Sequence, residues 1–417
     1  MSSKKQICYG AGFPPHPYRR ERERMKTILG LDRIDEFETV FRGKRIGLIT
    51  NYSGVNSDWK INIDLFMERG MKIIKIFTPE HGMFGKGAAQ PVDNAFYPGY
   101  QIPILSLFGE RQRPKEEELS DVDLLVYDIQ DVGLRYYTYI YTMTYCMEAA
   151  AKLSIPFVVL DRPNPLGNQI ICGGTVLPEY RSFIGDYDLP VRYGLTCGEM
   201  GYYFIQYKRL QMDYRVIPLK NYTREMYFCD TGTLWNIPSP ALTDFDSTIC
   251  YSGGCFAGAT SVSDGRGSAK PFQIYGAPYI DMERLYKELK HTIREEKVIF
   301  RQRAFIPVER KYMGEICFGI EFAPLDKTLD FIPVMLQFLR QVARLYPEYF
   351  SLADSSMGGK HLSFVTGSER AEAYLYGRLT LKELLEEWEA QSREFAKKAE
   401  EVRIYKQEVG NAVIYNN

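Results

Sequence analysis

The chain has 417 residues, which is long enough for two domains that each bury a hydrophobic core. Its 52 Lys and Arg residues are balanced by 53 Asp and Glu residues, so the formal net charge is -1 and the chain lacks the basic excess that nucleic acids or anionic membranes attract. No apolar stretch approaches the roughly 20 residues of a transmembrane helix, and no apolar signal-like segment follows the charged N-terminus. We therefore expect a cytoplasmic protein that binds neither nucleic acid nor membranes.

The chain begins with an arm, residues 1–26, that is rich in Pro, Gly and charged residues. Short apolar runs that are typical of buried strands then recur at residues 45–50, 73–77, 102–107, 122–127 and 157–160. Helical segments fit between several of these runs, for example at residues 61–69 and 137–153. This alternation predicts a Rossmann-like domain over residues 27–247, with a largely parallel sheet covered by helices on both faces.

The composition changes after residue 247. Residues 251–268 are rich in Gly and small residues and predict a loop, and strands are expected near Phe305 and Cys317. Amphipathic helices are expected at residues 281–293, 331–345 and 379–402. The pattern predicts a smaller α+β domain over residues 248–417.

Neither a metal nor a cofactor is expected. The eight Cys residues are scattered without a C-x-x-C pair, and the four His residues are dispersed along the chain. No G-x-G-x-x-G motif follows the first strand, which argues against a nicotinamide cofactor.

Polar residues stand directly after four of the predicted strands. In open α/β sheets, ligands bind outside the carboxyl ends of the strands, so these loops are the predicted active site. A single Asp or Asn in such a loop is often only a helix cap, but four polar loops in succession point to a binding site. The residues concerned are Asn51, then Glu80 and His81, then Asp128, Gln130, Asp131, Arg135 and Tyr137, and finally Asp161, Arg162 and Asn164.

Glu80 is the strongest catalytic candidate. Apolar neighbours such as Pro79 and Met83 predict partial burial, which would favour the protonated carboxyl that a general acid requires. The alternative is a structural carboxylate paired with an arginine. His81 could orient Glu80 or contact a ligand, or it could be a structural residue.

Asp128 and Asp131 could each supply the second carboxylate that glycoside hydrolysis usually requires, or each could cap a helix. Arg135 and Arg162 could hold a substrate carboxylate with their guanidinium forks, or one of them could neutralise Asp128 or Asp161. The Gly-rich segment around Arg266 lacks the pattern of a phosphate-binding loop and predicts a tight loop between the domains.

Several of these loops carry longer motifs. They are GLITN at residues 47–51, PEHG at 79–82, YDIQDVG at 127–133 followed by Arg135 and YTY at 137–139, LDRPNP at 160–165 and GRG at 265–267. In these motifs, over about residues 28–405, the chain resembles the NamZ-type exo-β-N-acetylmuramidases, a family of bacterial cell-wall recycling enzymes.

The resemblance implies a Rossmann-like domain, a smaller C-terminal domain and an active site in the cleft between them. It also implies release of N-acetylmuramic acid from the non-reducing end of peptidoglycan fragments, with Glu80 as the catalytic carboxylate. Where the family pattern reads EGTNLSEGRGT, this chain has AGATSVSDGRGS at residues 257–268, so one carboxylate and one asparagine are replaced. Arg266 lies in this segment and is expected, with the other polar loop residues, to contact the substrate.

Two other functions remain open. A catalytically silent muropeptide-binding or sensing protein would keep the cleft and lose the chemistry at Ala257 and Thr260. An amidase or esterase is the third possibility, but the chain has no G-x-S-x-G motif and no evident Cys–His pair. For the muramidase we further expect Arg135 or Arg162 to bind the lactyl carboxylate that distinguishes N-acetylmuramic acid from N-acetylglucosamine.

Overall fold

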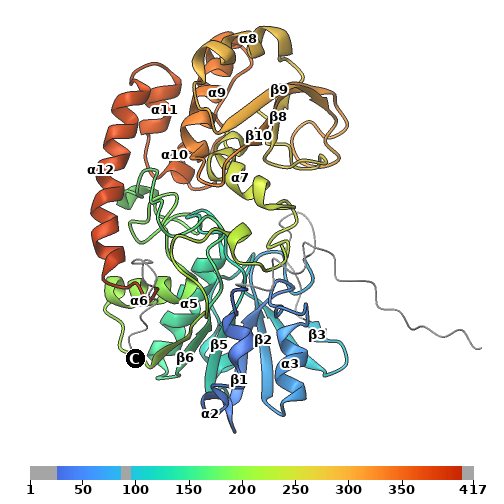
Figure 1. Ribbon diagram of the computed structural model, residues 1–417, viewed down its shortest axis with the longest axis vertical. Helices are drawn as coiled ribbons and strands as arrows, with labels where there is room; N and C mark the ends of the chain where they lie inside the picture. Colours follow the sequence, from blue (N-terminus) through green and yellow to red (C-terminus); the bar gives the residue numbers. More distant parts are fainter. Residues whose placement is uncertain (1–25, 86–94, 406–417) are drawn as a thin grey trace, which may run out of the picture.

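The computed structural model describes residues 26–85 and 95–405, so the predicted N-terminal arm lies, apart from Lys26, outside the described residues. The first part of the chain forms a seven-stranded sheet with the order β3-β4-β2-β1-β5-β6-β7, in which only β3 runs antiparallel to its neighbour (Figure 1). Its strands are β1 (Arg45–Thr50), β2 (Lys72–Thr78), β3 (Ala95–Tyr97), β4 (Ile102–Ser106), β5 (Leu124–Asp128), β6 (Phe157–Leu160) and β7 (Tyr214–Ile217). The prediction of a largely parallel, Rossmann-like sheet is confirmed.

Helices connect these strands and cover both faces of the sheet. The longer ones are α3 (Asn62–Glu68), α5 (Tyr139–Lys152) and α6 (Cys197–Lys208). The short ones are η1 (Gly30–Arg33), α2 (Glu38–Phe41), α4 (Glu116–Leu119), η2 (Pro178–Tyr180) and η3 (Phe228–Asp230).

The strand order creates a topological switch point between β1 and β5. The chain proceeds from β1 to β2 and β4 on one side, and then crosses to β5, β6 and β7 on the other. Thr50 at the end of β1 lies beside Asp128 at the end of β5, and Ile49 lies beside Phe77 of β2. The loops that follow β1, β2, β5 and β6 therefore meet at one edge of the sheet, where open α/β sheets bind their ligands.

The second part contains a three-stranded antiparallel sheet with the order β8-β10-β9. Its strands are β8 (Ile274–Ala277), β9 (Val298–Phe305) and β10 (Cys317–Pro324). Its helices are α7 (Phe245–Gly258), α8 (Met282–Thr292), α9 (Phe331–Leu345), α10 (His361–Thr366), α11 (Arg370–Leu375) and α12 (Leu381–Glu400). The smaller α+β region expected after the Rossmann-like domain is confirmed.

One prediction for this region is wrong, because the expected loop at residues 251–268 begins as helix α7. The glycines that indicated a loop are required by close packing instead. A Cβ atom at Gly253 would lie 2.6 Å from the Phe331 carbonyl oxygen, and one at Gly254 would lie 2.1 Å from the Tyr275 hydroxyl. Glycine thus lets α7 approach α9 and β8 closely.

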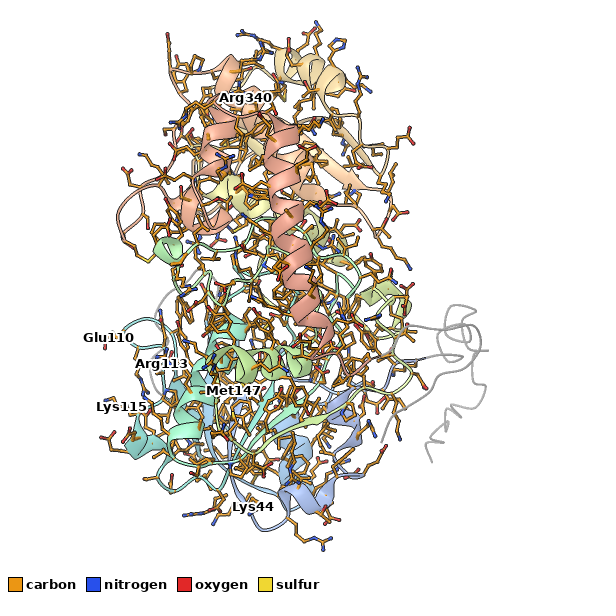
Figure 2. The ribbon with its side chains drawn as sticks, turned by 90° about the vertical axis from the view of Figure 1, so that its left-hand side faces the viewer. Lys44, Glu110, Arg113, Lys115, Met147 and Arg340 are labelled. Atoms are coloured by element: carbon orange, nitrogen blue, oxygen red, sulfur yellow. The ribbon has the colours of Figure 1, made fainter. Side chains whose placement is uncertain are left out.

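Helix α12 returns along the side of the molecule toward the first part (Figures 1 and 2). Ser392 donates a hydrogen bond to the Gly173 carbonyl oxygen at 2.9 Å, and the Phe395 ring packs edge-on against Tyr203 of α6. A single hydrophobic cluster also contains buried residues of both sheets. The two parts are therefore joined by a continuous core, which fixes the side chains that face each other across their boundary.

No helix in residues 26–85 and 95–405 is long and apolar enough to cross a membrane.

Candidate active site

Glu80 lies two residues beyond the end of β2, in a tight turn. The Gly82 amide donates to the Pro79 carbonyl oxygen at 3.0 Å, and His81 and Gly82 both adopt left-handed backbone conformations. The Glu80 carboxylate is half-buried and accepts a hydrogen bond from the Thr138 hydroxyl at 2.9 Å. Within the described parts of the chain, Glu80 forms no ion pair. The alternative, in which Glu80 is a structural carboxylate paired with an arginine, is therefore not observed among these residues.

Tyrosine side chains lie near Glu80. Tyr52 and Tyr139 both donate to the Pro238 carbonyl oxygen at 3.1 Å, and the Tyr137 and Tyr139 ring centroids are 4.5 Å apart. Burial raises the pKa of Tyr139, and the negative charge of Glu80 adds to this shift. The Glu80 carboxylate therefore lies near tyrosine hydroxyl groups that stay protonated at neutral pH.

The second part of the chain also reaches Glu80, through Tyr251 of α7. Tyr136 donates to the Tyr251 carbonyl oxygen at 2.9 Å, and their rings meet edge-on with centroids 5.2 Å apart. Burial raises the pKa of Tyr251, and the charge of Glu80 contributes to the shift. Glu80 thus lies where the two parts of the molecule meet.

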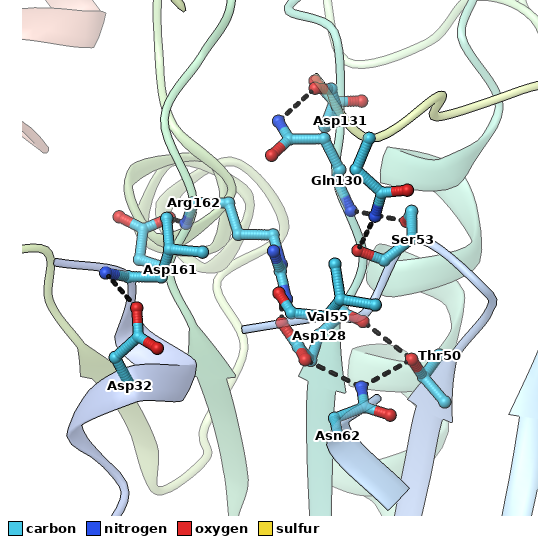
Figure 3. Close-up of polar contacts among 12 residues, drawn as sticks. Asp32, Thr50, Ser53, Val55, Asn62, Asp128, Gln130, Asp131, Asp161 and Arg162 are labelled. Carbon is cyan, nitrogen blue, oxygen red and sulfur yellow. Dashed lines mark hydrogen bonds and ion pairs between the residues drawn. The ribbon is translucent and has the colours of Figure 1, made fainter. Parts of the chain in front are cut away.

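Asp128 occupies a closed network at the switch point (Figure 3). It is fully buried, and Asn62 donates to its Oδ2 atom at 2.7 Å while Arg162 donates to its Oδ1 atom at 2.7 Å. Arg162 also donates to the Val55 carbonyl oxygen at 2.9 Å. Of the alternatives for Arg162, neutralisation of Asp128 is therefore the one observed.

Asp161 is likewise surrounded by protein donors. Its carboxylate accepts hydrogen bonds from the hydroxyls of Thr196 at 2.7 Å and Tyr405 at 2.6 Å, and from the amides of Gly198 and Arg162. Burial nevertheless raises the pKa of Asp161. This carboxylate joins β6 to α6 and to the segment that follows α12.

The amide side chains of this edge hold its loops together. Asn51 accepts from the amide and hydroxyl of Ser53 at 2.9 and 2.6 Å. Gln130 donates to the carbonyl oxygens of Asp131 and Pro163 at 2.7 and 2.9 Å. Asn164 accepts from the Leu166 amide at 3.1 Å and donates to the Leu195 carbonyl oxygen at 3.2 Å.

Asp131 differs from Asp128 because it is incompletely bonded. It accepts from the Gly133 amide at 2.7 Å and from the Tyr193 hydroxyl, but its Oδ1 atom has no hydrogen-bond partner among the described residues. Burial raises its pKa to about 6. The buried hydroxyl of Tyr137 also lacks a partner within the described ranges.

Arg135 is fully buried and binds backbone. It donates to the carbonyl oxygens of Gly174, Leu189 and Val365, the last two at 2.8 and 2.7 Å, and burial lowers its pKa to about 10. Because Val365 belongs to α10, this arginine ties the second part of the chain to the first. Its position leaves no room for a substrate carboxylate.

Arg266 lies on the other side of the boundary. Its guanidinium pairs with Asp264 at 2.8 Å, lies 5.7 Å from the centroid of the Phe272 ring, and is about a third exposed. The Phe272 ring in turn packs 4.5 Å from Tyr251. Of the arginines expected to contact substrate, Arg266 alone combines exposure with a position near Tyr251.

Sequence reasoning did not single out Thr138, Tyr251 or Asp264. Thr138 could have been found, because it lies in the YTY motif that was already recognised. Tyr251 reaches the site through the packing of α7, which the Gly-rich pattern concealed, and Asp264 lies in the loop that follows this helix. No group of three or more His, Cys, Asp or Glu residues in ranges 26–85 and 95–405 is placed to hold a metal ion.

Comparisons with known proteins identify the family of this chain. Models of the N-terminal and C-terminal domains of exo-β-N-acetylmuramidase NamZ match residues 46–246 and 249–405. The chain belongs to the NamZ family. The peptidoglycan β-N-acetylmuramidase NamZ of Bacillus subtilis (strain 168) is 34% identical over 399 residues, which cover 95% of each protein.

Solved structures support the same fold. A DUF1343 family protein from Bacteroides fragilis NCTC 9343 superimposes with a TM-score of 0.83 at 30% identity, covering 92% of this chain and all of its own. A second DUF1343 family protein from that organism has a TM-score of 0.72 at 24% identity, covering 91% of this chain and 99% of its own. The family resemblance seen in the motifs is confirmed.

Proposed function

We propose that this protein is an exo-β-N-acetylmuramidase that releases N-acetylmuramic acid from the non-reducing end of peptidoglycan fragments. The observation that carries the proposal is Glu80, a half-buried carboxylate that forms no ion pair with any described residue, at the carboxyl edge of the sheet and at the boundary between the two parts. The full-length similarity to a peptidoglycan β-N-acetylmuramidase supplies the substrate class.

Glu80 is proposed as the general acid. The protonated carboxyl gives its proton to the glycosidic oxygen as the bond from that oxygen to the sugar C1 breaks, and water adds at C1 to complete the hydrolysis. The Thr138 hydroxyl fixes one carboxylate oxygen and leaves the other for the leaving group. The surrounding tyrosine rings exclude water and present apolar faces and hydroxyl groups that suit a sugar.

A second group must activate water or stabilise the positive charge that develops on the sugar. Asp128 is poorly suited to this role, because both of its oxygens hold protein donors. Asp264 is unsuited for the same reason, because both of its oxygens face the Arg266 guanidinium. Asp131 has one oxygen without a partner among the described residues. We propose that Asp131, or the 2-acetamido group of the substrate itself, acts together with Glu80.

The remaining loop residues are proposed to shape the site. Asn51, Gln130, Asn164 and Arg162 brace the loops in which they lie, and His81 shapes the turn that presents Glu80. Tyr137 packs against Tyr139, whose pKa is raised by burial and by the charge of Glu80, and is proposed to support the tyrosine side chains near the catalytic carboxyl.

The test is hydrolysis of a chromogenic β-N-acetylmuramide, with the matching β-N-acetylglucosaminide as a control. The proposal predicts release of the chromophore from the muramide and much slower release from the glucosaminide. Tight binding of a muropeptide without release from either compound would instead support the silent-binding alternative.

A further inference from the structure

A positively charged cluster lies beside the proposed catalytic site, in the second part of the chain. It consists of Arg266, Lys311 and His361, with Asp264 as the acidic side chain that pairs with it. The cluster has no role in the proton transfer proposed for Glu80. Arg135 and Arg162, the arginines expected to read an anionic substrate group, are buried and bound to protein acceptors.

Arg266 is only partly used by the protein. Its Nε and Nη2 atoms face the Asp264 carboxylate, at 3.1 and 2.8 Å. Its Nη1 atom makes no hydrogen bond within the described residues, and about a third of the side chain is exposed. One edge of the guanidinium fork is therefore free to bind an acceptor from outside the protein.

Lys311 adds a second positive charge to the cluster. Its ammonium group donates to the carbonyl oxygens of Ala257, Gly258, Thr260 and Val262 at the end of α7. Burial lowers the pKa of Lys311 to about 8, so the group remains mostly charged at neutral pH. Because its hydrogens are committed to these carbonyls, Lys311 contributes charge to the cluster rather than a direct contact.

His361 completes the cluster. Its imidazole is half-buried, and burial together with the charges of Lys311 and Arg266 lowers its pKa, so the ring is largely neutral at pH 7. Its side chain makes no hydrogen bond within the described parts of the chain. One positive charge therefore remains after Arg266 and Lys311 are balanced against Asp264, and the neutral His361 imidazole offers one N–H donor near it.

The cluster is connected to Glu80 through packed aromatic rings. Arg266 lies over Phe272, Phe272 packs against Tyr251, and Tyr251 meets Tyr136, two residues before the Thr138 that holds Glu80. The charges of both Arg266 and Glu80 act on Tyr251. A sugar bound between the two parts would have its scissile bond at Glu80 and a substituent directed toward Arg266.

We propose that Arg266, assisted by His361 and the charge of Lys311, is the specificity-determining site that binds the lactyl carboxylate of N-acetylmuramic acid. The inference rests on the proposed function. N-acetylglucosamine lacks this carboxylate, so it would leave the Arg266 fork unused. A free guanidinium edge in a positively charged cluster is well suited to bind a carboxylate.

The experiment compares the variants Arg266→Met, Arg266→Lys and His361→Asn with the wild type on the chromogenic muramide and glucosaminide. For Arg266→Met we expect kcat/KM on the muramide to fall about 10- to 100-fold, the effect of losing a charge-assisted hydrogen bond. Turnover of the glucosaminide should stay within about twofold. Arg266→Lys keeps the positive charge but loses the guanidinium fork, so its kcat/KM on the muramide should lie between those of the wild type and Arg266→Met.

Arg301→Met is the matched control, because Arg301 is an exposed arginine of the same part of the chain that pairs with Glu321. It should leave both substrates unaffected. An unchanged ratio of muramide to glucosaminide activity in Arg266→Met and His361→Asn would overturn the inference.

Calorimetric binding of free N-acetylmuramic acid and N-acetylglucosamine separates this inference from the proposed function. If the wild type hydrolyses neither substrate but binds N-acetylmuramic acid more tightly, and Arg266→Met removes that preference, the proposed function fails and the inference stands. If the wild type hydrolyses the muramide while Arg266→Met keeps the binding preference, the inference fails alone. Arg266→Lys shows whether a loss in Arg266→Met comes from an unpaired Asp264, because it retains the positive charge beside that carboxylate.

Discussion

Two polar regions lie at the same edge of the parallel sheet, and they differ in how completely the protein uses their hydrogen-bonding groups. The loops after β1, β5 and β6 bury Asp128, Asp161 and Arg162 in contacts with one another and with backbone. The loop after β2 leaves Glu80 half-buried, and among the described residues its hydrogen-bond partner is the Thr138 hydroxyl. A polar residue after a strand therefore indicates chemistry only where its hydrogen-bonding groups are not already paired with other groups of the protein.

The largest expected effect on stability comes from disrupting the buried network of Asp128, Asp161 and Arg162. Arg162→Ala would leave Asp128 buried without its counter-charge, and the free energy of unfolding should fall by roughly 3–5 kcal/mol. Denaturant unfolding measures this loss. Arg301→Ala, which removes an exposed partner of Glu321, should cost less than about 1 kcal/mol. Equal stability of the two variants would show that the buried Arg162–Asp128 pair stabilises the fold no more than an exposed ion pair does.

A smaller effect is expected from pH, through Glu199 beside Asp161. Glu199 is fully buried and accepts hydrogen bonds from the Thr196 amide at 3.0 Å and the Ile404 amide at 3.0 Å. Burial raises its pKa to about 7. A raised acid pKa means that the folded state holds the proton more tightly than the unfolded state, so this contribution to stability is complete below pH 4.5 and is lost as the pH rises to about 7.

The loss from Glu199 should approach about 3 kcal/mol between these limits. Unfolding of the wild type and of Glu199→Gln, measured at pH 5.5 and 7.5, tests the prediction. Gln keeps the hydrogen-bond acceptor and cannot ionise, so the variant should lose less stability over this interval, with the remaining dependence coming from groups such as Asp131. A pH dependence identical in both proteins would contradict the role given to Glu199.

The smallest expected effect is that of chelation. The proposed mechanism uses the Glu80 carboxyl, and Asp128 is neutralised by Arg162, so the proposal requires no metal ion at either residue. Exhaustive treatment with a chelator should leave hydrolysis of the muramide unchanged. Loss of activity that returns on adding zinc or manganese would mean that the site contains a ligand set that the described residues do not form.

Much of the fold follows from the sequence, because fully buried parallel strands appear as short apolar runs. β1, β5 and β6 were predictable for this reason, since nearly all of their residues are buried. β3 was not, because it is a three-residue edge strand whose side chains are mostly exposed. α7 was hidden by glycines that serve close packing rather than a turn.

The candidate site was only partly predictable. Position after a strand identified Glu80 and the loops around it, but sequence cannot tell a carboxylate with a partner from one without. Asp128 is the last residue of β5 and Glu80 lies two residues beyond β2, and only the structure shows that Arg162 reaches the former. The positions of Arg266 and Tyr251 near Glu80 depend on packing between the two parts of the chain. Both residues lie more than 170 residues from Glu80 in the sequence, so local sequence patterns do not reveal this proximity.

The most direct test of the account is to measure turnover of the chromogenic muramide and thermal unfolding of the same Glu80→Gln preparation. Gln preserves shape and hydrogen bonding but cannot give a proton to the leaving oxygen, so kcat should fall by at least about 10²- to 10⁴-fold while the Tm stays near that of the wild type. Near-normal turnover with a sharply lowered Tm would contradict the account, because it would place Glu80 with Asp128 among the carboxylates that hold the fold together.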